Sequence, residues 1–490
     1  MNFKMVVYLI GHILRLEALF MVPAMAISFF GKEPVSARAF FITIMVLLSV
    51  SLFATFRKPK SRGFYTREGF LVTALAWMVM SLFGALPFFI SGEIPNYLFA
   101  VFETVSGLTT TGASILKDVE VMSKGMLYWR SFTHWLGGMG ILVFLLAILP
   151  MTQGSGSTLH IMRAESPGPE VGKLVPRLHQ MAKILYLIYC ALTVMQMVLL
   201  LLGDMPLFDT VCITFGTAGT GGFGVLNSSC ADYSPYCQIV ITVFMMLFGV
   251  NFSIFYLLLM REFSQALLNQ ELRVYLGIML SAVILVTVNI LPVYRSNLPE
   301  ALRYASFQVA SIMTTTGFAT ADFNLWPQLS RSIMVVLMVL GASAGSTGGG
   351  IKSARVLILF QSAKQSLRKM LNPREVNVVK VDGKALDDEV IEGVHVYMTI
   401  YCAVAAVSFL IVSLDNFSLE TNLTAVLSCL NNIGPGLGEV GPTGNFSGFS
   451  AGSTVVLILN MLIGRLEIFP MLFLFAPSNW KRTRVLRPNV

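Results

Sequence analysis

Long apolar stretches alternate with short polar segments along the whole chain. A helix that crosses the hydrocarbon core of a bilayer needs about 20 mostly apolar residues, and such stretches recur from Met5 to Phe475. We predict ten apolar helices, at about 5–30, 37–56, 69–90, 125–150, 181–202, 238–260, 274–293, 331–370 with an interruption, 393–414 and 453–475. The first is too long for a signal peptide and carries Arg15 and Glu17, so we expect it to be retained. The pattern predicts an all-α polytopic membrane protein.

Composition and charge support this class. The 490 residues are 55% hydrophobic and only 12% charged, which excludes an ordinary soluble globular domain. The net charge of +8 comes from basic residues in short segments between apolar runs, at 57–67, 163–183, 364–384 and 481–487. The positive-inside rule places these segments in the cytoplasm. The connections expected outside are 91–124, 203–236, 294–328 and 415–448. The charge therefore reflects membrane topology, not nucleic-acid binding.

A repeat follows the first two helices. The remaining helices form pairs, and between the members of each pair lies a shorter, half-apolar segment that ends in glycine. The four endings are 109–113, 218–222, 314–318 and 431–435, aligned so that Gly112, Gly221, Gly317 and Gly434 correspond. Acidic residues near the start of each short segment favour a helix N-terminus there: Glu103, Asp209, Glu300 and Glu420. The pattern predicts two N-terminal helices plus four helix/pore-helix/helix repeats around a pseudo-fourfold pore, divided as 1–66, 67–160, 161–270, 271–385 and 386–490.

The four glycine endings have the chemistry of a cation site. A short helix that stops inside the membrane leaves backbone carbonyls unpaired, and a dehydrated cation can satisfy them. The negative C-terminal ends of four such helices add attraction for the cation. The candidate ligand residues are Thr110, Thr111, Gly112, Thr220, Gly221, Thr315, Thr316, Gly317, Asn432, Ile433 and Gly434. The alternative for any single loop is ordinary small-residue helix packing, and recurrence in four loops argues against it.

A glycine-rich segment, 341–350, interrupts the apolar run at 331–370. So much glycine destroys helix propensity, and irregular backbone at membrane depth must line protein or a water-filled cavity. A tight cytoplasmic loop between two separate helices is the alternative. A phosphate-binding loop is excluded, because the segment lacks the Walker spacing and no soluble strand precedes it.

Two polar side chains in the apolar runs are also candidates. Arg465 lies in the last predicted helix, where an intramembrane arginine marks an ion path by default. Its alternatives are a local pair with Glu467 and snorkelling to an interface. For His134 we favour a satisfied polar residue between helices.

Three segments resemble signatures of the Trk/Ktr superfamily of potassium-uptake pore subunits: 128–140 (YWRSFTHWLGGMG), 341–355 and 464–470 (GRLEIFP). The resemblance implies a potassium filter at the four endings, with K⁺ as the bound substrate ion and no covalent cofactor. It also implies a gate beneath the filter, formed by Gly345, Ser346, Thr347, Gly348, Gly349, Gly350 and Lys352, with Arg465 projecting towards the pore.

The resemblance further implies a homodimer with one pore per protomer, located in the bacterial plasma (inner) membrane. A separate cytoplasmic, nucleotide-binding regulatory subunit of the TrkA type is the implied partner. The two extra N-terminal helices favour the TrkH branch of the family over the shorter KtrB branch. One departure concerns Gly219, which we align with Thr110 and Thr315. It leaves fewer side-chain oxygens, which puts discrimination between potassium and sodium in doubt.

Cys230 and Cys237 fall in or beside one outside segment, where their spacing allows a disulfide without requiring one. Two other functions compete with ion conduction. A secondary transporter of an organic solute would also have broken helices and repeats, but would need a midplane substrate pocket. A membrane enzyme would need convergent catalytic groups, and we identify none in the sequence, so we expect no enzyme.

Overall fold

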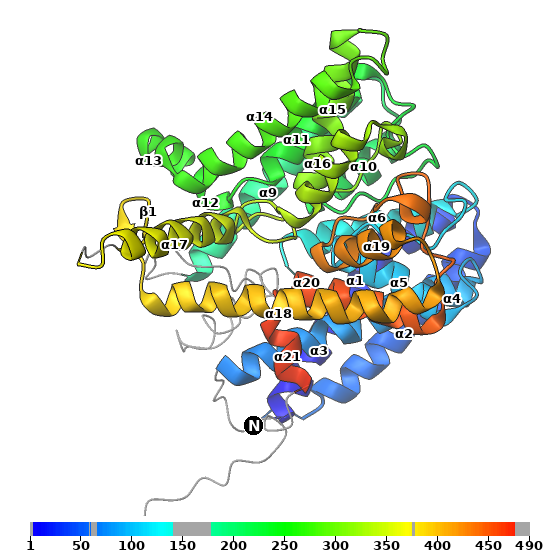
Figure 1. The fold of residues 1–490 in the computed structure, drawn as a ribbon. Helices are drawn as coiled ribbons and strands as arrows, with labels where there is room; N and C mark the ends of the chain where they lie inside the picture. Colours follow the sequence, from blue (N-terminus) through cyan, green and yellow to red (C-terminus); the bar gives the residue numbers. More distant parts are fainter. Residues whose placement is uncertain (1–2, 58, 60–65, 141–177, 375–377, 476–490) are drawn as a thin grey trace, which may run out of the picture.

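The computed structural model describes residues 3–57, 59, 66–140, 178–374 and 378–475, and Figure 1 shows that this part of the chain is mostly helical. Six of its helices are long and apolar enough to cross a membrane, or seven if one bent pair counts as a single span. The prediction of an all-α polytopic membrane protein is confirmed. Several calls lie outside the described residues: the end of the helix at 125–150, the boundary at 160 and the basic segment 481–487.

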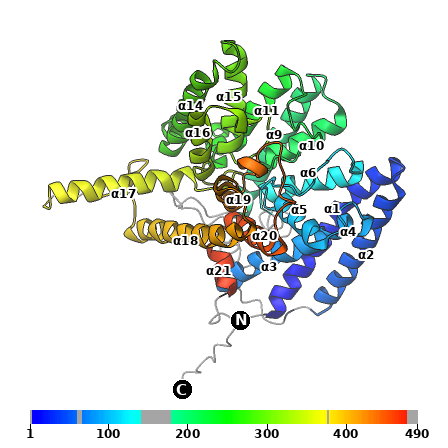
Figure 2. The same cartoon turned by 45° about the vertical axis from the view of Figure 1, so that its right-hand side comes forward.

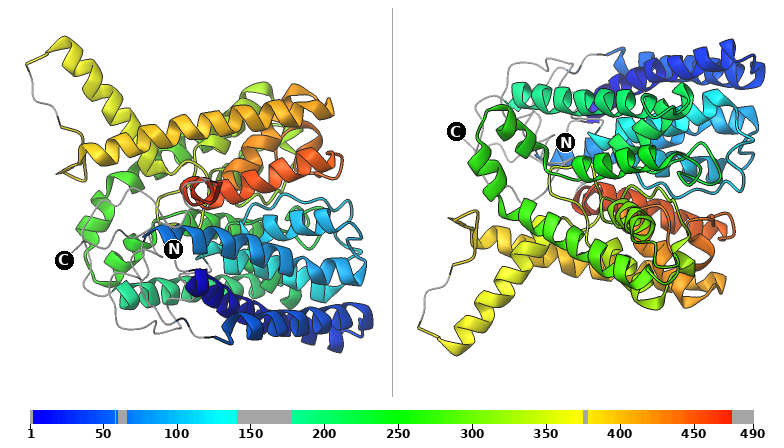
Figure 3. Two further views of the ribbon diagram at one scale, coloured as in Figure 1. Left: turned by 90° about the horizontal axis from the view of Figure 1, so that it is seen from below. Right: turned by 90° about the horizontal axis from the view of Figure 1, so that it is seen from above.

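The two N-terminal helices pack against each other at one edge of the helical bundle, in dark blue in Figure 3. They are α1 (Phe3–Phe30) and α2 (Pro34–Thr55). Pro34 opens α2, where its fixed φ suits the first helical turn and no backbone hydrogen bond is lost.

The rest of the chain forms four units, each with a first helix, a short helix and a second helix. The first unit contains α3 (Thr66–Gly84), α4 (Leu86–Ser91), α5 (Tyr97–Leu108) and α6 (Lys124–Gly138). The second contains α9 (Leu178–Leu201), α10 (Leu207–Gly219), α11 (Pro235–Phe248) and α12 (Phe252–Leu259), followed by α13 (Phe263–Leu268).

The third unit contains α14 (Gln270–Ile290), α15 (Leu298–Met313), α16 (Gln328–Val339) and α17 (Ser353–Leu371). The fourth contains α18 (Asp388–Val412), α19 (Leu419–Asn431), α20 (Ala451–Arg465) and α21 (Phe469–Phe475). Short 3-10 turns η1 (Phe323–Leu325), η2 (Ser413–Asp415) and η3 (Gly438–Val440) lie in the connections. Strands β1 (Lys380–Val381) and β2 (Lys384–Ala385) pair antiparallel.

The four units close into a circle. In each unit the short helix packs against both long helices of its own unit. It also packs against the second helix of the preceding unit: α10 against α6, α15 against α11, α19 against α16, and α5 against α20. The last of these contacts joins the fourth unit to the first, so that α5, α10, α15 and α19 surround a common centre.

Within the described residues, three second helices are broken, and only one break is evident in the predicted pattern. The interruption between α16 and α17 lies at the predicted glycine-rich segment, and α17 then projects away from the rest of the chain (Figure 2). The run predicted at 238–260 is instead two helices, α11 and α12, bent by 91°. The run predicted at 453–475 breaks between Arg465 and Phe469, where Glu467 and Ile468 adopt positive φ angles of 54° and 71°.

The prediction that Glu103 marks a helix N-terminus is wrong. Helix α5 begins at Tyr97 and is capped by Asn96, whose side chain accepts a hydrogen bond from the Leu98 N–H. Glu103 therefore lies in the middle of α5, where its carboxylate cannot serve the helix terminus. Asp209, Glu300 and Glu420 do lie in the first turns of their helices, as predicted.

Candidate functional site

The short helices α5, α10, α15 and α19 all end in the same backbone conformation. One residue of each end adopts a left-handed φ of 55–58°: Thr110, Thr220, Thr315 and Asn432. The next residue donates its N–H to a carbonyl five residues earlier, as Thr111 does to Ser106 at 2.8 Å, which is the Schellman arrangement. Threonine is β-branched and rarely occupies this region, and such residues cluster at functional sites. The repetition of this conformation in four helix ends therefore indicates a functional site.

The glycine that follows also recurs. Two residues after each left-handed residue stands a glycine with positive φ: Gly112 (81°), Gly222 (80°), Gly317 (85°) and Gly434 (104°). This pattern corrects our alignment of the second loop by one position. Thr220, not Gly219, corresponds to Thr110, and Gly222, not Gly221, corresponds to Gly112. The second loop therefore has a threonine hydroxyl, that of Thr220, at the position where our alignment placed Gly219.

The four endings, which we call loop 1 (109–113), loop 2 (218–222), loop 3 (314–318) and loop 4 (431–435), form a closed ring. A methyl group on Gly112 would overlap the carbonyl oxygen of Gly221, and one on Gly222 would overlap that of Thr316. One on Gly317 would overlap the carbonyl oxygen of Ile433. A methyl group on Gly434 would lie 2.9 Å from the carbonyl oxygen of Thr111, which completes the circle. Each glycine is thus required by the backbone of the next loop.

Hydroxyl groups hold the individual loops in shape. In loop 1 the hydroxyls of Thr109 and Thr111 are hydrogen-bonded at 2.8 Å, and in loop 3 those of Thr314 and Thr316 at 2.7 Å. Loop 4 joins loop 1 through the Asn432 side-chain amide, which donates to Thr111 Oγ1 at 3.0 Å. These bonds are short and neutral, and all of these side chains are buried.

Two side-chain oxygens of the ring have no hydrogen-bond partner within the described part of the chain. They are Thr110 Oγ1 and Asn432 Oδ1, and both belong to left-handed residues. An unsatisfied buried polar atom costs free energy and calls for a role. Both atoms are suitable ligands for a hard cation.

His134 lies beside the ring and is fully satisfied. Its Nδ1 is 2.8 Å from the Gly107 carbonyl oxygen, and its Nε2 accepts the Phe223 N–H at 3.2 Å. This pairing requires a neutral ring with the proton on Nδ1. The interpretation of His134 as a satisfied polar residue between helices is confirmed.

The glycine-rich loop, 341–350, leaves α16 and returns beside its own starting point. The Gly341 N–H donates to the Ile351 carbonyl at 2.9 Å, and the Ser353 N–H donates to the Ala342 carbonyl at 3.1 Å. The loop then fills the sharp bend between α11 and α12. It donates from the Ser343 N–H to the Gly249 carbonyl at 3.1 Å and accepts from the Phe252 N–H at 3.1 Å through the Gly345 carbonyl. The broken helix ends thereby find partners that they would otherwise lack.

The same loop contacts the ring. The Gly349 N–H donates to Thr315 Oγ1 at 2.6 Å. A methyl group on Gly348 would lie 2.9 Å from the Thr314 carbonyl oxygen, and one on Gly349 would lie 2.5 Å from that of Asn431. The loop is therefore packed against loops 3 and 4, which argues against a loop that projects freely into the cytoplasm.

Arg465 ties this loop to two other units. Its Nη1 donates to the Thr347 carbonyl at 2.9 Å, and its Nη2 donates to the carbonyls of Gly138, at 2.9 Å, and Gly137 at the end of α6. Glu467 forms an ion pair with Arg355 of α17. Arg465 thus joins the fourth unit to the first and third.

Further charged and polar side chains hold the glycine-rich loop, and sequence reasoning missed all but one. Buried Lys352, which was predicted, donates from Nζ to the Gly348 carbonyl. Glu271 of α14 accepts the Ala344 N–H at 2.5 Å and the Asn251 side-chain amide at 3.4 Å. The run Gly249-Val250-Asn251 inside an apolar stretch was the available signal, because glycine ends helices and asparagine caps them.

Cys230 and Cys237 are free and buried, so the disulfide that their spacing allows is absent from the structure. No group of three or more His, Cys, Asp or Glu side chains among the described residues could hold a metal ion.

A helical multi-pass membrane protein whose four units bring their short helices to one ring belongs to the class of membrane transport proteins. The family model described as "Cation transport protein", TrkH, matches residues 36–482. The chain therefore belongs to the TrkH family.

Individual relatives agree with this assignment. The "Trk system potassium uptake protein TrkH" of Salmonella typhimurium is 36% identical over 457 residues, covering 91% of this chain and 93% of the relative. The protein of the same description from Halomonas elongata is 31% identical and covers 98% of this chain and 100% of the relative. The crystal structure of "the Potassium Transporter TrkH" from Vibrio parahaemolyticus matches with a TM-score of 0.87 and 31% identity, covering 98% of this chain and 100% of that chain.

Proposed function

We propose that this chain is the potassium-conducting subunit of a Trk-type uptake system and that the ring of four loops is its selectivity filter. The observation that carries the proposal is the closed ring. At one position of each loop only glycine fits, because a side chain there would overlap the backbone of the next loop. The family assignment and the names of the relatives support potassium as the ion.

In this mechanism a potassium ion sheds its water on the outer side and is coordinated by oxygens of loops 1–4. Backbone carbonyls can replace the hydration shell, and the C-terminal ends of α5, α10, α15 and α19 add negative potential at the centre. The unpartnered oxygens of Thr110 and Asn432 supply side-chain ligands. Transport then follows the electrochemical gradient of the ion.

The glycine-rich loop is the proposed gate. It is held against the inner side of the ring by the bond from Gly349 to Thr315 and by Arg465, which donates to Thr347. Opening would require the release of a few polar contacts, while the hydroxyl bonds within the ring stay intact. Shortening the loop within 341–350 should therefore raise the flux without altering ion selectivity.

The proposal includes the orientation and the partners. We place the basic connections in the cytoplasm of a bacterial cell on the positive-inside rule. We also propose a homodimer and a cytoplasmic, nucleotide-binding regulatory subunit, supported by the resemblance and by the "Trk system" in the relatives' names.

The test is cation flux into proteoliposomes containing the purified chain, comparing rubidium with sodium at a fixed diffusion potential. Selective, potential-driven rubidium uptake that changes with Gly317→Ser would support the filter, since a side chain there overlaps the Ile433 carbonyl. Absence of cation flux, with and without cytoplasmic partners, would contradict the proposal and favour a transporter of organic solutes.

A further inference from the structure

The outer sides of the four loops are joined to one another at four junctions, and one junction differs in kind. Loops 2 and 3 are joined by the Cys230 N–H, which donates to the Ala319 carbonyl at 2.9 Å. The connections after loops 4 and 1 are joined by the Phe446 N–H, which donates to the Ser114 carbonyl at 2.8 Å. Both of these junctions are neutral; the first also includes the Ala319 N–H, which donates to the Ser229 hydroxyl at 3.1 Å.

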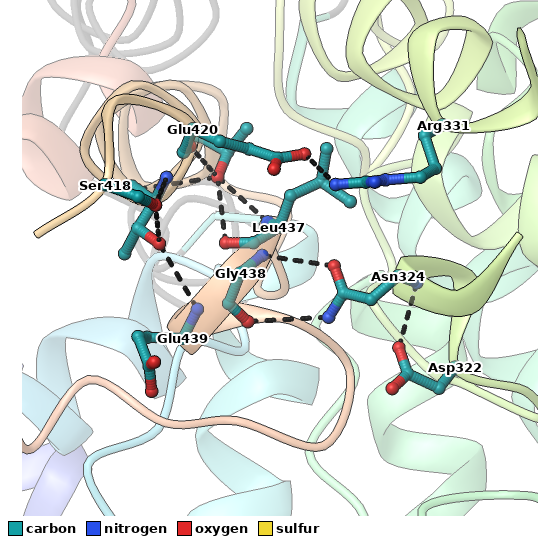
Figure 4. A network of polar contacts seen from close by, with 10 residues as sticks. Asp322, Asn324, Arg331, Ser418, Glu420, Leu437, Gly438 and Glu439 are labelled. Carbon is teal, nitrogen blue, oxygen red and sulfur yellow. Dashed lines mark hydrogen bonds and ion pairs between the residues drawn. The ribbon is translucent and has the colours of Figure 1, made fainter. Parts of the chain in front are cut away.

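The junction of the third and fourth units uses a side-chain amide at the loop exits. Figure 4 shows Asn324, whose Oδ1 accepts the Gly438 N–H at 3.1 Å and whose Nδ2 donates to the Gly438 carbonyl at 3.4 Å. An ion pair between Arg331 and Glu420 lies nearby, with side chains 24% and 40% exposed. This charged pair is at the rim, where water weakens it.

The junction of loops 1 and 2 is charged and buried. Arg130 of α6 donates from Nε to Glu103 of α5 at 2.6 Å, and the two side chains are only 3% and 0% exposed. Nη1 of the same arginine donates to the Gly224 carbonyl at 3.0 Å, and its guanidinium lies 3.5 Å from the centre of the Phe223 ring. Phe223 and Gly224 directly follow the ring glycine of loop 2.

Glu103 connects to the other loop. Its Oε1 accepts the Ser114 hydroxyl at 2.9 Å, and its Oε2 accepts the Ile115 N–H at 3.0 Å. Ser114 and Ile115 follow loop 1 as Gly224 follows loop 2. One buried ion pair therefore fixes the exits of both loops at once.

This device is confined to the first unit. Glu103 stands seven residues before the left-handed residue of its loop, and the same position holds Ile213, Gln308 and Ala425 in the other units. The pseudo-fourfold arrangement is therefore broken at the level of the side chains that surround the ring, although its backbone is repeated.

From these contacts we infer that Glu103 and Arg130 are positioning residues that set the ion discrimination of the ring by fixing the spacing of loops 1 and 2. Where cavity size sets the discrimination of a ring of oxygens, the ratio depends on how far the ring can contract or widen. A planar guanidinium that binds a carboxylate and a carbonyl together restricts that movement. The inference rests on the proposed function of the ring as a filter.

The test uses Glu103→Gln, Arg130→Gln and the double variant, reconstituted in proteoliposomes, with the ratio of rubidium to sodium flux as the readout. The double variant leaves no lone buried charge, so we expect it to fold even where a single variant does not. We expect the flux ratio of the double variant to fall by about tenfold, since bonds to charged groups are lost on both loops. Arg130→Lys keeps the charge but loses the planar guanidinium that binds the carboxylate and the carbonyl together. Its flux ratio should fall by less than that of the double variant.

The matched control is Arg331→Gln with Glu420→Gln, which removes the exposed pair at the rim and should leave the ratio unchanged. A folded double variant, monodisperse in size-exclusion chromatography, with the wild-type ratio would overturn the inference and leave the pair a stabilising role only. If the double variant is not folded, the test rests on Arg130→Lys. A wild-type ratio of rubidium to sodium flux in that variant would also overturn the inference. Absence of selective flux in the wild type would instead contradict the proposed function.

Discussion

The ring of four loops and the glycine-rich loop beneath it are both built from glycine and hydroxyl residues, yet they are held in different ways. In the ring, each glycine is confined by the backbone of its neighbour, and the bonds that shape the loops are neutral. The loop at 341–350 also has backbone contacts, but charged side chains hold it in addition: Glu271 and Lys352 of its own unit and Arg465 of the fourth unit.

This difference fits the proposed roles of the ring as filter and of the glycine-rich loop as gate. Steric confinement by backbone cannot be released without rebuilding four helix ends, so the ring is suited to a fixed task. A few charge-assisted bonds can be exchanged for other partners, since each contributes only about 1.5–3 kcal/mol. A loop held by such bonds is suited to move.

The largest effect should come from Gly222→Ala in the ring. The added methyl would overlap the Thr316 carbonyl oxygen, and the φ of 80° is unfavourable for any L side chain. We expect rubidium uptake in proteoliposomes to fall to the background level. The comparison with Gly221→Ala sharpens the corrected alignment, because Gly221 has no positive φ and its methyl would overlap a side chain, the His134 ring at 2.2 Å, and not the backbone of the next loop. Greater loss with Gly221→Ala than with Gly222→Ala would contradict that alignment.

A smaller effect, opposite in sign, is expected for Arg465→Ala. The variant removes donors to the Thr347, Gly137 and Gly138 carbonyls, which should free the glycine-rich loop. Rubidium flux should rise by about tenfold, the equivalent of one charge-assisted bond, with an unchanged ratio to sodium. Arg273→Ala, on an exposed arginine of α14, is the control. A change in the selectivity ratio would show that the ring and the loop are not separable.

Glu271→Gln weakens the attachment of the same glycine-rich loop and should have a smaller effect on rubidium flux than Arg465→Ala. Glutamine can still accept the Ala344 N–H, but the bond loses its charge and about 1 kcal/mol. We expect the flux to rise by only a few-fold. Glu262→Gln, an exposed carboxylate bonded to Gln265, should change nothing. Equal flux from the two variants would argue against Glu271 as a tether of the loop.

The smallest effect is expected for Gly277→Ala in α14. No atom lies within 4 Å of a methyl group built there, and the residue has no positive φ. Uptake should be unchanged, while thermal stability in detergent should stay equal or rise slightly, because alanine favours a helix by about 1 kcal/mol. A loss of uptake would mean that glycine content itself, not confinement, explains the effect in the ring.

Much of the architecture follows from local sequence. Apolar length alone predicted the membrane helices, and the recurrence of threonine and glycine predicted that four short helices would end alike. The glycine-rich interruption at 341–350 was equally evident, since glycine disfavours a helix wherever it occurs. Each of these properties belongs to a single segment, so it can be read without knowing its neighbours.

Other features depended on what each segment meets in space. The one-residue shift in loop 2, with Thr220 and Gly222 in the repeated positions, shows only in the backbone angles. The break between α11 and α12 forms because a loop about 100 residues away supplies hydrogen bonds to the freed helix ends. Arg465 could not be assigned to the carbonyls of Gly137, Gly138 and Thr347 from sequence, since these come from two other units.

The sequence by itself thus determined which segments are apolar enough for a membrane and which short segments end in glycine, because apolar length and backbone freedom are local properties. Only the tertiary structure decided how the four endings close into a ring and which charged side chains are paired inside it. Glu103 shows the reason. Its place in the chain suggested a helix terminus, but burial next to Arg130 makes it one half of an ion pair between α5 and α6 that also binds the exits of two loops. Burial is a property of the assembled fold.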